Sequence, residues 1–232
     1  MTIDKAYTEL YQKRQDKRAY PNEFAIRTFL GAYPTLPDAF RNVESYRGKT
    51  ILDLGCGDGR NMPLFDACDM RIFGTEVSQE ARDAVTRRME SIGIQCDVRV
   101  GRSNNLPFSD SFFDFIFASG VLSFVDRGDT FANNLPEPHR VLRHDGYFAV
   151  YLLAATASQL KGAADLGGGH YEIRTDPFGR VNGSIVRAFA TRDEIRAELR
   201  EHFKVEAIGS SEVDVYGFVG INVWWLVCSP VR

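Results

Sequence analysis

Three glycines at alternate positions follow a short apolar segment that contains one acidic residue. The sequence from Ile51 to Asn61 is ILDLGCGDGRN, in which Asp53 precedes Gly55, Gly57 and Gly59. Glycines at this spacing let the backbone turn tightly and come close to a ligand. A helix after the turn would direct its unpaired backbone amides at the same ligand. The pattern predicts a buried strand, a ligand-binding turn and a helix.

Two classes of nucleotide cofactor are bound by such a turn, and the glycine spacing separates them. A dinucleotide site requires G-x-G-x-x-G, but Arg60 stands where the third glycine belongs. This argues against an NAD-dependent oxidoreductase. The order D-x-G-x-G-x-G instead resembles motif I of the class I S-adenosylmethionine-dependent methyltransferases. Because any βα turn of a doubly wound domain can carry similar glycines, other segments have to support this interpretation.

A second acidic residue lies about twenty residues past the glycines. The segment from Met70 to Val77, MRIFGTEV, is a short apolar run that ends at Glu76 and is followed by Ser78, a good helix N-cap residue. A carboxylate at the end of a second strand can accept hydrogen bonds from the ribose hydroxyls of an adenosine cofactor. The alternative is an ordinary loop carboxylate.

The segment from Gly101 to Val125 resembles the same family. It contains the L-P-F step and the F-D pair that opens a fourth strand, and R-V-L at residues 140–142 resembles the turn into strand five. We expect a helix from Asp129 to Leu142, interrupted by Pro136 and Pro138, and a bend at Gly146 before the fifth strand. In the family an acidic residue after strand three accepts the adenine amino group, whereas this chain has Arg102, which can only donate. We therefore expect Ser103 and Asn104 to recognise adenine. The alternative is that adenine is held mainly by packing.

The composition limits the possible functions. The chain has 232 residues, 44% of them hydrophobic and 25% charged, with a formal net charge of −3. These values fit one globular domain and disfavour nucleic-acid binding. No apolar run is long enough to span a membrane, and the first residues lack the apolar core of a signal peptide, so we expect a cytoplasmic protein. Four scattered cysteines suggest free thiols and no metal site: Cys56, Cys68, Cys96 and Cys228.

The resemblance implies an α/β fold: a doubly wound, Rossmann-like sheet of seven strands, mostly parallel, with one antiparallel strand near the edge. We expect a single methyltransferase domain over residues 1–232, with a helical lid at residues 1–47 and an acceptor-side insertion at residues 155–190. The lid should contain two short helices broken at Tyr20 and Pro21, and Arg14 or Arg27 could meet the cofactor carboxylate. Two extended runs, residues 170–175 and 184–190, should form the insertion.

Within the family, the chain is similar to the small-molecule branch that includes tellurite-resistance-type methyltransferases. This resemblance implies methyl transfer from S-adenosylmethionine to a small-molecule acceptor, with S-adenosylhomocysteine as product. A non-catalytic, cofactor-binding regulatory or assembly subunit is the alternative. No catalytic residue is assigned; Tyr151, His170 and Tyr171 are candidates for a base, and the acceptor and oligomeric state stay open. The predicted cofactor-binding residues are Asp53, Gly55, Cys56, Gly57, Gly59, Asn61, Glu76, Val77, Ser78, Ser103, Asn104, Ser119 and Leu122.

Overall fold

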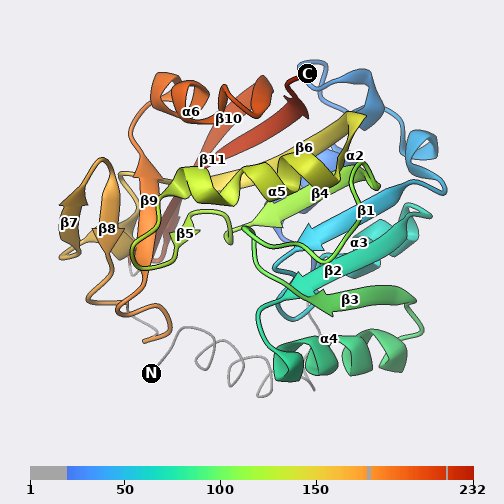
Figure 1. The fold of residues 1–232 in the computed structure, drawn as a ribbon, viewed down its shortest axis with the longest axis horizontal. Coiled ribbons are helices and arrows are strands. Elements are labelled where there is room, and N and C mark those ends of the chain that lie inside the picture. Colours follow the sequence, from blue (N-terminus) through green and yellow to red (C-terminus); the bar gives the residue numbers. More distant parts are fainter. Residues whose placement is uncertain (1–19, 177–178, 218) are drawn as a thin grey trace.

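A computed structural model describes residues 20–176, 179–217 and 219–232, which form an α/β fold around one large sheet (Figure 1). The strands are β1 (Thr50–Leu54), β2 (Arg71–Glu76), β3 (Cys96–Val100), β4 (Phe113–Ser119), β5 (Phe124–Val125), β6 (Leu142–Ala154), β7 (Ala164–Gly167), β8 (His170–Glu172), β9 (Ile185–Phe189), β10 (Phe203–Val215) and β11 (Val219–Pro230). The α-helices are α2 (Glu23–Leu30), α3 (Met62–Ala67), α4 (Gln79–Ser91), α5 (Pro136–Val141) and α6 (Arg192–Leu199), and the 3-10 turns are η1 (Asp38–Phe40), η2 (Val43–Tyr46), η3 (Phe131–Asn134) and η4 (Ser158–Leu160).

Seven of these strands form the predicted body of the sheet. β3, β2, β1, β4 and β6 are parallel neighbours in that order. β11 then pairs antiparallel with β6, and β10 pairs antiparallel with β11. All five residues of β1 are buried, as expected for a central strand covered on both faces. The predicted fold class is therefore confirmed.

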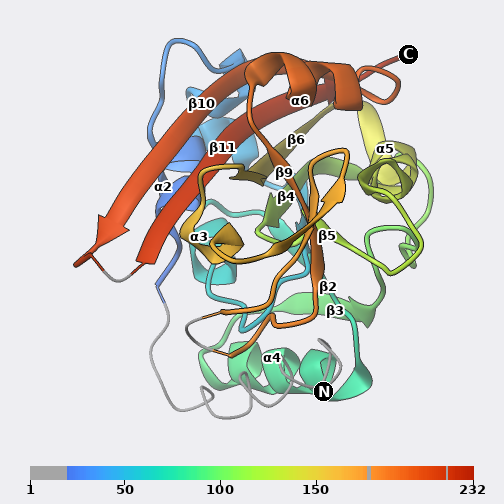
Figure 2. The same cartoon turned by 90° about the vertical axis from the view of Figure 1, so that its left-hand side faces the viewer.

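The sheet of the described residues has 11 strands rather than seven. The additional strands are β5, β7, β8 and β9. They are present because the end of β6 offers a free edge for pairing. β6 continues past the end of β4, and β9 pairs with the exposed edge through Leu153 and Ala188. β8 and β5 then pair antiparallel with β9, and β7 pairs with β8. We call β5 together with residues 155–176 and 179–190 the roof; it stands at one end of the sheet (Figures 1 and 2).

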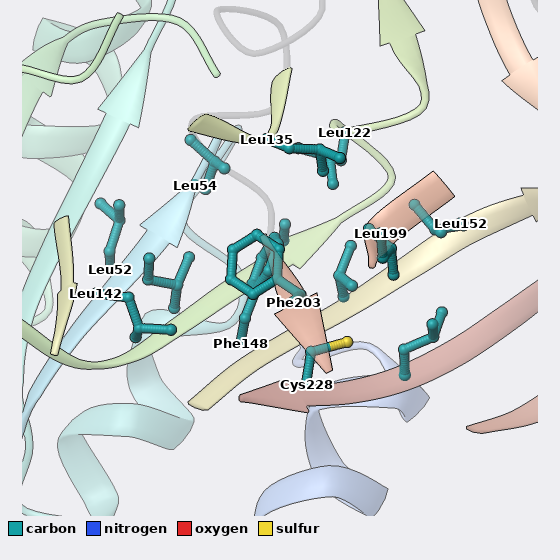
Figure 3. Close-up of a cluster of buried hydrophobic side chains, with 14 of the residues drawn as sticks. Leu52, Leu54, Leu122, Leu135, Leu142, Phe148, Leu152, Leu199, Phe203 and Cys228 are labelled. Atoms are coloured by element: carbon teal, nitrogen blue, oxygen red, sulfur yellow. The ribbon is translucent and has the colours of Figure 1, made fainter. Parts of the chain in front are cut away.

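Two hydrophobic cores lie on opposite faces of the sheet. One packs α5 and α6 against β1, β4 and β6, and Figure 3 shows its members Leu52, Phe148, Leu199 and Phe203 converging. The other packs α2, α3 and α4 against the opposite face. Successive strand residues point to alternate faces, so Phe148 belongs to the first core and Ala149 to the second.

Several local predictions need correction. Of the two expected N-terminal helices, the second is α2, capped by Asn22, whereas the first falls in residues 1–19, outside the described part. The helix expected from Asp129 to Leu142 is instead η3 followed by the short α5. Gly146 was expected to bend the chain before strand five, but it lies inside β6, where a Cβ atom would come within 2.8 Å of the Asp114 carbonyl oxygen. Glycine is needed there for close strand packing.

The four cysteines are free thiols, and three of them are buried. Among the residues that the structure describes, none of the helices is both long and apolar enough to cross a membrane.

Candidate functional site

A cavity of about 500 Å³ lies at the carboxyl ends of the parallel strands. Its lining comes from the ends of β1, β2 and β4, from the turn after β3, from residues 124–127 and 134, and from residues 182–185 of the roof. Ligands of open α/β sheets bind at this end of the strands, and the volume is in the range of small-molecule sites. The cavity is the candidate site.

The glycine turn forms one wall of the cavity and depends on its glycines. Gly55, Gly57 and Gly59 have φ angles of 62°, 62° and 70°, a region that side chains with a Cβ atom rarely adopt. A Cβ atom on Gly55 would lie 2.6 Å from Cγ2 of Val121, and one on Gly59 would lie 2.7 Å from Cγ2 of Val85. The turn therefore packs closely against the segment after β4 and against α4.

The end of β2 is tied to this turn. The Glu76 carboxylate accepts a hydrogen bond from the Gly57 backbone amide, and the Thr75 hydroxyl accepts one from the Gly55 amide at 3.2 Å. Glu76 is only 5% exposed, yet it lines the cavity. Its carboxylate thus lies beside the glycine turn, where the ribose of an adenosine compound is expected in this type of fold.

Asp53 is a buried carboxylate that lacks a full set of partners. Its side chain is hydrogen-bonded to Asn61, but the oxygen Oδ2 has no partner among the described residues. Burial raises the pKa of Asp53 well above its ordinary range, the nearby carboxylates Glu76 and Asp58 raise it further, and the Asn61 bond lowers it. An orphaned oxygen in such a carboxylate cluster fits a cationic group such as an ammonium.

The start of α2 lies over the glycine turn and the end of β4. The Asn22 backbone amide donates to Oδ1 of Asn61 at 3.1 Å, and Nδ2 of Asn22 donates to the Ser119 hydroxyl at 2.5 Å. Arg27, further along α2, lies outside the cavity lining, and its guanidinium donates to Glu23 and Tyr33. Arg14, the other arginine considered for the cofactor carboxylate, lies outside the described residues.

The turn after β3 lines the cavity on the side away from β1. Arg102 and Asn105 exchange backbone hydrogen bonds of 2.9 and 3.1 Å, so Ser103 and Asn104 are at the tip of a tight turn. Across the cavity, Nη1 of Arg102 lies 3.5 Å from Oδ1 of Asp126, which also lines the cavity.

The predicted cofactor residues fall into two groups. Those that line the cavity are Gly55, Glu76, Val77, Ser103, Asn104 and Ser119. The other group lies in the supporting structure: Asp53, Cys56, Gly57, Gly59 and Asn61 belong to the glycine turn and its surroundings, Ser78 caps α4, and Leu122 is fully buried in the core. The structure thus brings the predicted segments together, although the Ser78 and Leu122 side chains do not reach the cavity.

Sequence reasoning missed the lining that the roof and its neighbours contribute. Asn134 is 7% exposed and donates to the carbonyl oxygens of Leu122 and Phe124 at 3.1 and 2.8 Å. Ser184, also buried, lies just before β9. These residues carry no recognisable motif, because their place depends on pairing between β5 and β9.

The three candidate bases lie outside the cavity lining. The Tyr151 hydroxyl is next to Gly120, where an added Cβ atom would lie 2.7 Å from it. Burial raises the pKa of Tyr151, and the Arg60 charge partly offsets this rise. His170 accepts a hydrogen bond from the Phe131 amide at 3.4 Å, and Tyr171 lies in β8 opposite Val186. Tyr151 is the candidate nearest to the strand ends that form the cavity.

Comparison with known proteins gives the arrangement a family. Residues 52–150 match the model of a methyltransferase domain. The chain is 31% identical over 116 residues to an O-methyltransferase of Aspergillus nomiae, covering 47% of this chain and 48% of that protein. It is 26% identical over 188 residues to a sterol 4-C-methyltransferase of Caenorhabditis elegans, covering 78% and 54%. The chain therefore spans about half the length of these curated relatives.

Solved structures show the same fold. A methyltransferase structure from Methanosarcina mazei has a TM-score of 0.66 at 19% identity, covering 85% of this chain and 97% of that one. A Burkholderia thailandensis N-methyltransferase with bound 1,6-didemethyltoxoflavin and S-adenosylhomocysteine has a TM-score of 0.66 at 17% identity, covering 99% and 88%. Residues 52–150 therefore match a methyltransferase domain, and the chain has the fold of these S-adenosylmethionine-dependent methyltransferases of known structure.

Proposed function

We propose that the protein transfers a methyl group from S-adenosylmethionine to a small-molecule acceptor. The observation that carries this proposal is the composition of the cavity wall. Gly55 and Glu76 on the cofactor side line the same cavity as Ser184 and Ile185 of the roof. A cofactor held at the glycine turn would therefore share one space with a second molecule held under the roof.

The roof side of the cavity has the character of a small-molecule site. Phe124, Val125 and Ile185 supply apolar surface, while Asn134 and Ser184 supply a few buried polar groups. Such a mixture orients a ligand of modest size. The similarity to an O-methyltransferase and to an enzyme crystallised with a small heterocycle supports the same class of acceptor.

The residues around the glycine turn favour a cationic methyl donor. Asp53, Asp58 and Glu76 bring three carboxyl groups together, and Asp58 pairs with Arg60 at 3.1 Å and Arg88 at 3.7 Å. A positively charged ligand would find an acceptor at Oδ2 of Asp53, which has no hydrogen-bond partner among the described residues. When bound, S-adenosylmethionine supplies an activated methyl group.

With the donor already activated, the protein's main task is positioning. Bringing two reactants into line can account for several kcal/mol of the reaction barrier. The glycine turn and Glu76 would hold the donor, while the roof would hold the acceptor and exclude water. Tyr151, beside Gly120 at the strand ends, is the candidate to hydrogen-bond the nucleophile or take its proton.

The proposal extends to the domain plan and the location. We assign residues 1–232 to one domain, with residues 1–47 as a lid and residues 155–190 as the acceptor-side cover. The contacts of Asn22 with Asn61 and Ser119 support the lid, and the roof residues in the cavity wall support the cover. Free thiols and a net charge of −3 support a cytoplasmic protein that binds no nucleic acid.

Calorimetry followed by an acceptor screen tests this function. We expect S-adenosylmethionine and S-adenosylhomocysteine to bind and NAD not to bind. Methyl release is then measured with phenols, amines, thiols, nitrogen heterocycles and tellurite. Turnover with one of these classes supports the proposal, whereas cofactor binding without turnover over a broad panel favours the regulatory subunit. Binding of NAD in preference to both sulfur compounds would contradict the assignment.

A further inference from the structure

An ion pair crosses the cavity between two segments that are distant in sequence. Arg102 lies in the turn after β3, and Asp126 follows β5 directly. Their side chains approach to 3.5 Å, and both residues line the cavity. The side chains are 41% and 55% exposed, so the pair stays accessible to a ligand.

The position of Glu76 indicates which part of the cofactor reaches this pair. β2 and β3 are parallel neighbours, and Glu76 is in register with Val100. The turn from Arg102 to Asn105 therefore lies about one strand spacing, roughly 5 Å, from Glu76. If the ribose hydroxyls bind Glu76, the attached base extends over this turn. This step rests on the proposed use of S-adenosylmethionine.

The chemistry of adenine then decides which residue it needs. Its 6-amino group is a donor and must meet an acceptor when it is buried, and arginine has donors only. Among the described residues that line the cavity, the carboxylates are Glu76 and Asp126. Glu76 already accepts from Gly57 and, under the proposed function, also binds the ribose hydroxyls.

We propose that Asp126 accepts a hydrogen bond from the adenine 6-amino group and that Arg102 is a positioning residue that holds this carboxylate over the cavity. The turn at Ser103 and Asn104 remains available to bind the ring nitrogens through its backbone. The adenine pocket is then assembled from both sides of the cavity, with its acidic residue supplied from the segment after β5.

The roof fixes the position of Asp126. Val125, the residue before it, pairs with Ile185 of β9, and Asn134 donates to the Phe124 carbonyl oxygen at 2.8 Å. The Asp129 amide donates to the Asp126 carbonyl oxygen at 3.0 Å and closes a turn. The same pairing that closes the acceptor side therefore presents Asp126 to the cofactor.

The test compares two ligands on five proteins by calorimetry. The ligands are S-adenosylhomocysteine and its 6-oxo analogue, in which the amino group is replaced. The proteins are the wild type, Asp126→Ala, Arg102→Ala, Asn104→Ala and the control Asp129→Ala. Asp129 belongs to the same exposed loop and carries the same charge, but it does not line the cavity. Near-ultraviolet circular dichroism verifies that each variant is folded.

We expect Asp126→Ala to weaken S-adenosylhomocysteine binding about tenfold and to leave the 6-oxo analogue nearly unchanged, so that the preference for the amino compound disappears. Arg102→Ala should show a smaller loss in the same direction, and Asn104→Ala and Asp129→Ala should keep the preference. A preference that survives in Asp126→Ala overturns the inference while leaving the cofactor assignment intact. Failure of the wild type to bind S-adenosylhomocysteine overturns both.

Discussion

The glycine-turn region, residues 50–77, and the roof line the same cavity but are held in place in different ways. In the glycine turn itself, the backbone amides of Gly57 and Gly55 donate to Glu76 and Thr75, which lie 19 and 20 residues later in the same βαβ unit. In the roof the decisive partners come from elsewhere. The Arg187 amide donates to the Ser123 carbonyl oxygen at 2.8 Å, and the indole of Trp224 in β11 donates to the Phe189 carbonyl oxygen at 2.9 Å.

This difference separates local from distant specification. A turn that needs positive φ angles, a close approach and a carboxylate 19 residues later has to carry these features in one short stretch of sequence. The roof pairs with the free edge of β6, and this pairing requires only residues that fit that edge, not a fixed motif. We therefore expect changes in the glycine turn to act on cofactor binding first and changes in the roof to act on folding first.

The largest expected effect is that of Gly55→Val. The new side chain would have a φ angle of 62° and a Cβ atom 2.6 Å from Cγ2 of Val121, at the wall of the cavity. We expect affinity for S-adenosylhomocysteine to fall at least about a hundredfold, which corresponds to roughly 2.7 kcal/mol. Calorimetry on the folded variant measures this loss.

Gly48→Val is the matched control for this change. Gly48 has a φ angle of 70°, close to that of Gly55, but a Cβ atom there would have no neighbour within 4 Å, and the residue lies outside the cavity lining. The Gly48→Val variant should lose stability through backbone strain and keep its affinity for S-adenosylhomocysteine. Equal losses of affinity in both variants would show that strain, and not the shape of the turn, controls binding.

The same contrast explains what the sequence could predict. The plan of the sheet was implied by the resemblance to a methyltransferase family, whereas the first strand, the glycine turn, Glu76 at the end of β2 and the N-cap Ser78 followed from residue types at fixed spacing. Each depends on interactions within one βα unit, where the spacing of residues determines the geometry. The roles of the predicted site residues in binding remain predictions, although the structure places Gly55, Glu76 and Ser119 at one cavity.

The parts that could not be predicted depend on pairing over long distances. β5 has two residues, too few for a periodic pattern, and it exists because it pairs with β9 about 60 residues later. The place of Gly146 inside β6 depends on close contact with Asp114 of β4. Arg187 also gave no signal, because an arginine in a short strand is ordinarily exposed, whereas here only 8% of its side chain is exposed.

Arg187→Ala should have the next largest effect, on folding. The guanidinium lies 3.6 Å from Glu198 and 3.9 Å from Glu194, donates to the Ala188 carbonyl oxygen and stacks 4.0 Å from the Phe189 ring centre. Removing a buried charge with these contacts should lower the free energy of unfolding by about 2 to 4 kcal/mol. Urea unfolding measures this change.

An exposed ion pair between the roof and the segment after β5 gives the control. Arg127 lies 2.9 Å from Glu172, but 73% of its side chain is exposed, so Arg127→Ala should change stability by less than about 1 kcal/mol. The folded Arg187→Ala protein should lose no more affinity for S-adenosylhomocysteine than Asp126→Ala does. If Arg187→Ala had the same free energy of unfolding as the wild type, Arg187 would not hold the roof in place.

The smallest expected effect is a pH dependence that belongs to the glycine-turn region alone. Burial, together with the charges of Glu76 and Asp58, raises the pKa of Asp53 well above its ordinary range. The group is therefore protonated in the free protein at pH values where an unfolded chain would ionise it. Its contribution to stability is fully present below the unfolded pKa of about 4 and is lost as the pH rises through the folded pKa.

Cofactor binding should show the opposite trend, because an ammonium group beside Oδ2 of Asp53 stabilises the ionised form and lowers its pKa. Affinity for S-adenosylhomocysteine should then rise with pH between the bound and the free pKa of Asp53, by at most tenfold per pH unit. Asp53→Asn keeps the shape of the side chain but cannot ionise, so its affinity should be lower at neutral pH and nearly constant across this window. Calorimetry in two buffers of different ionisation enthalpy should also detect proton release in the wild type and none in the variant. If both proteins showed the same pH dependence, the ammonium group would not lie beside Asp53, and the orphaned oxygen would have no part in binding the cofactor.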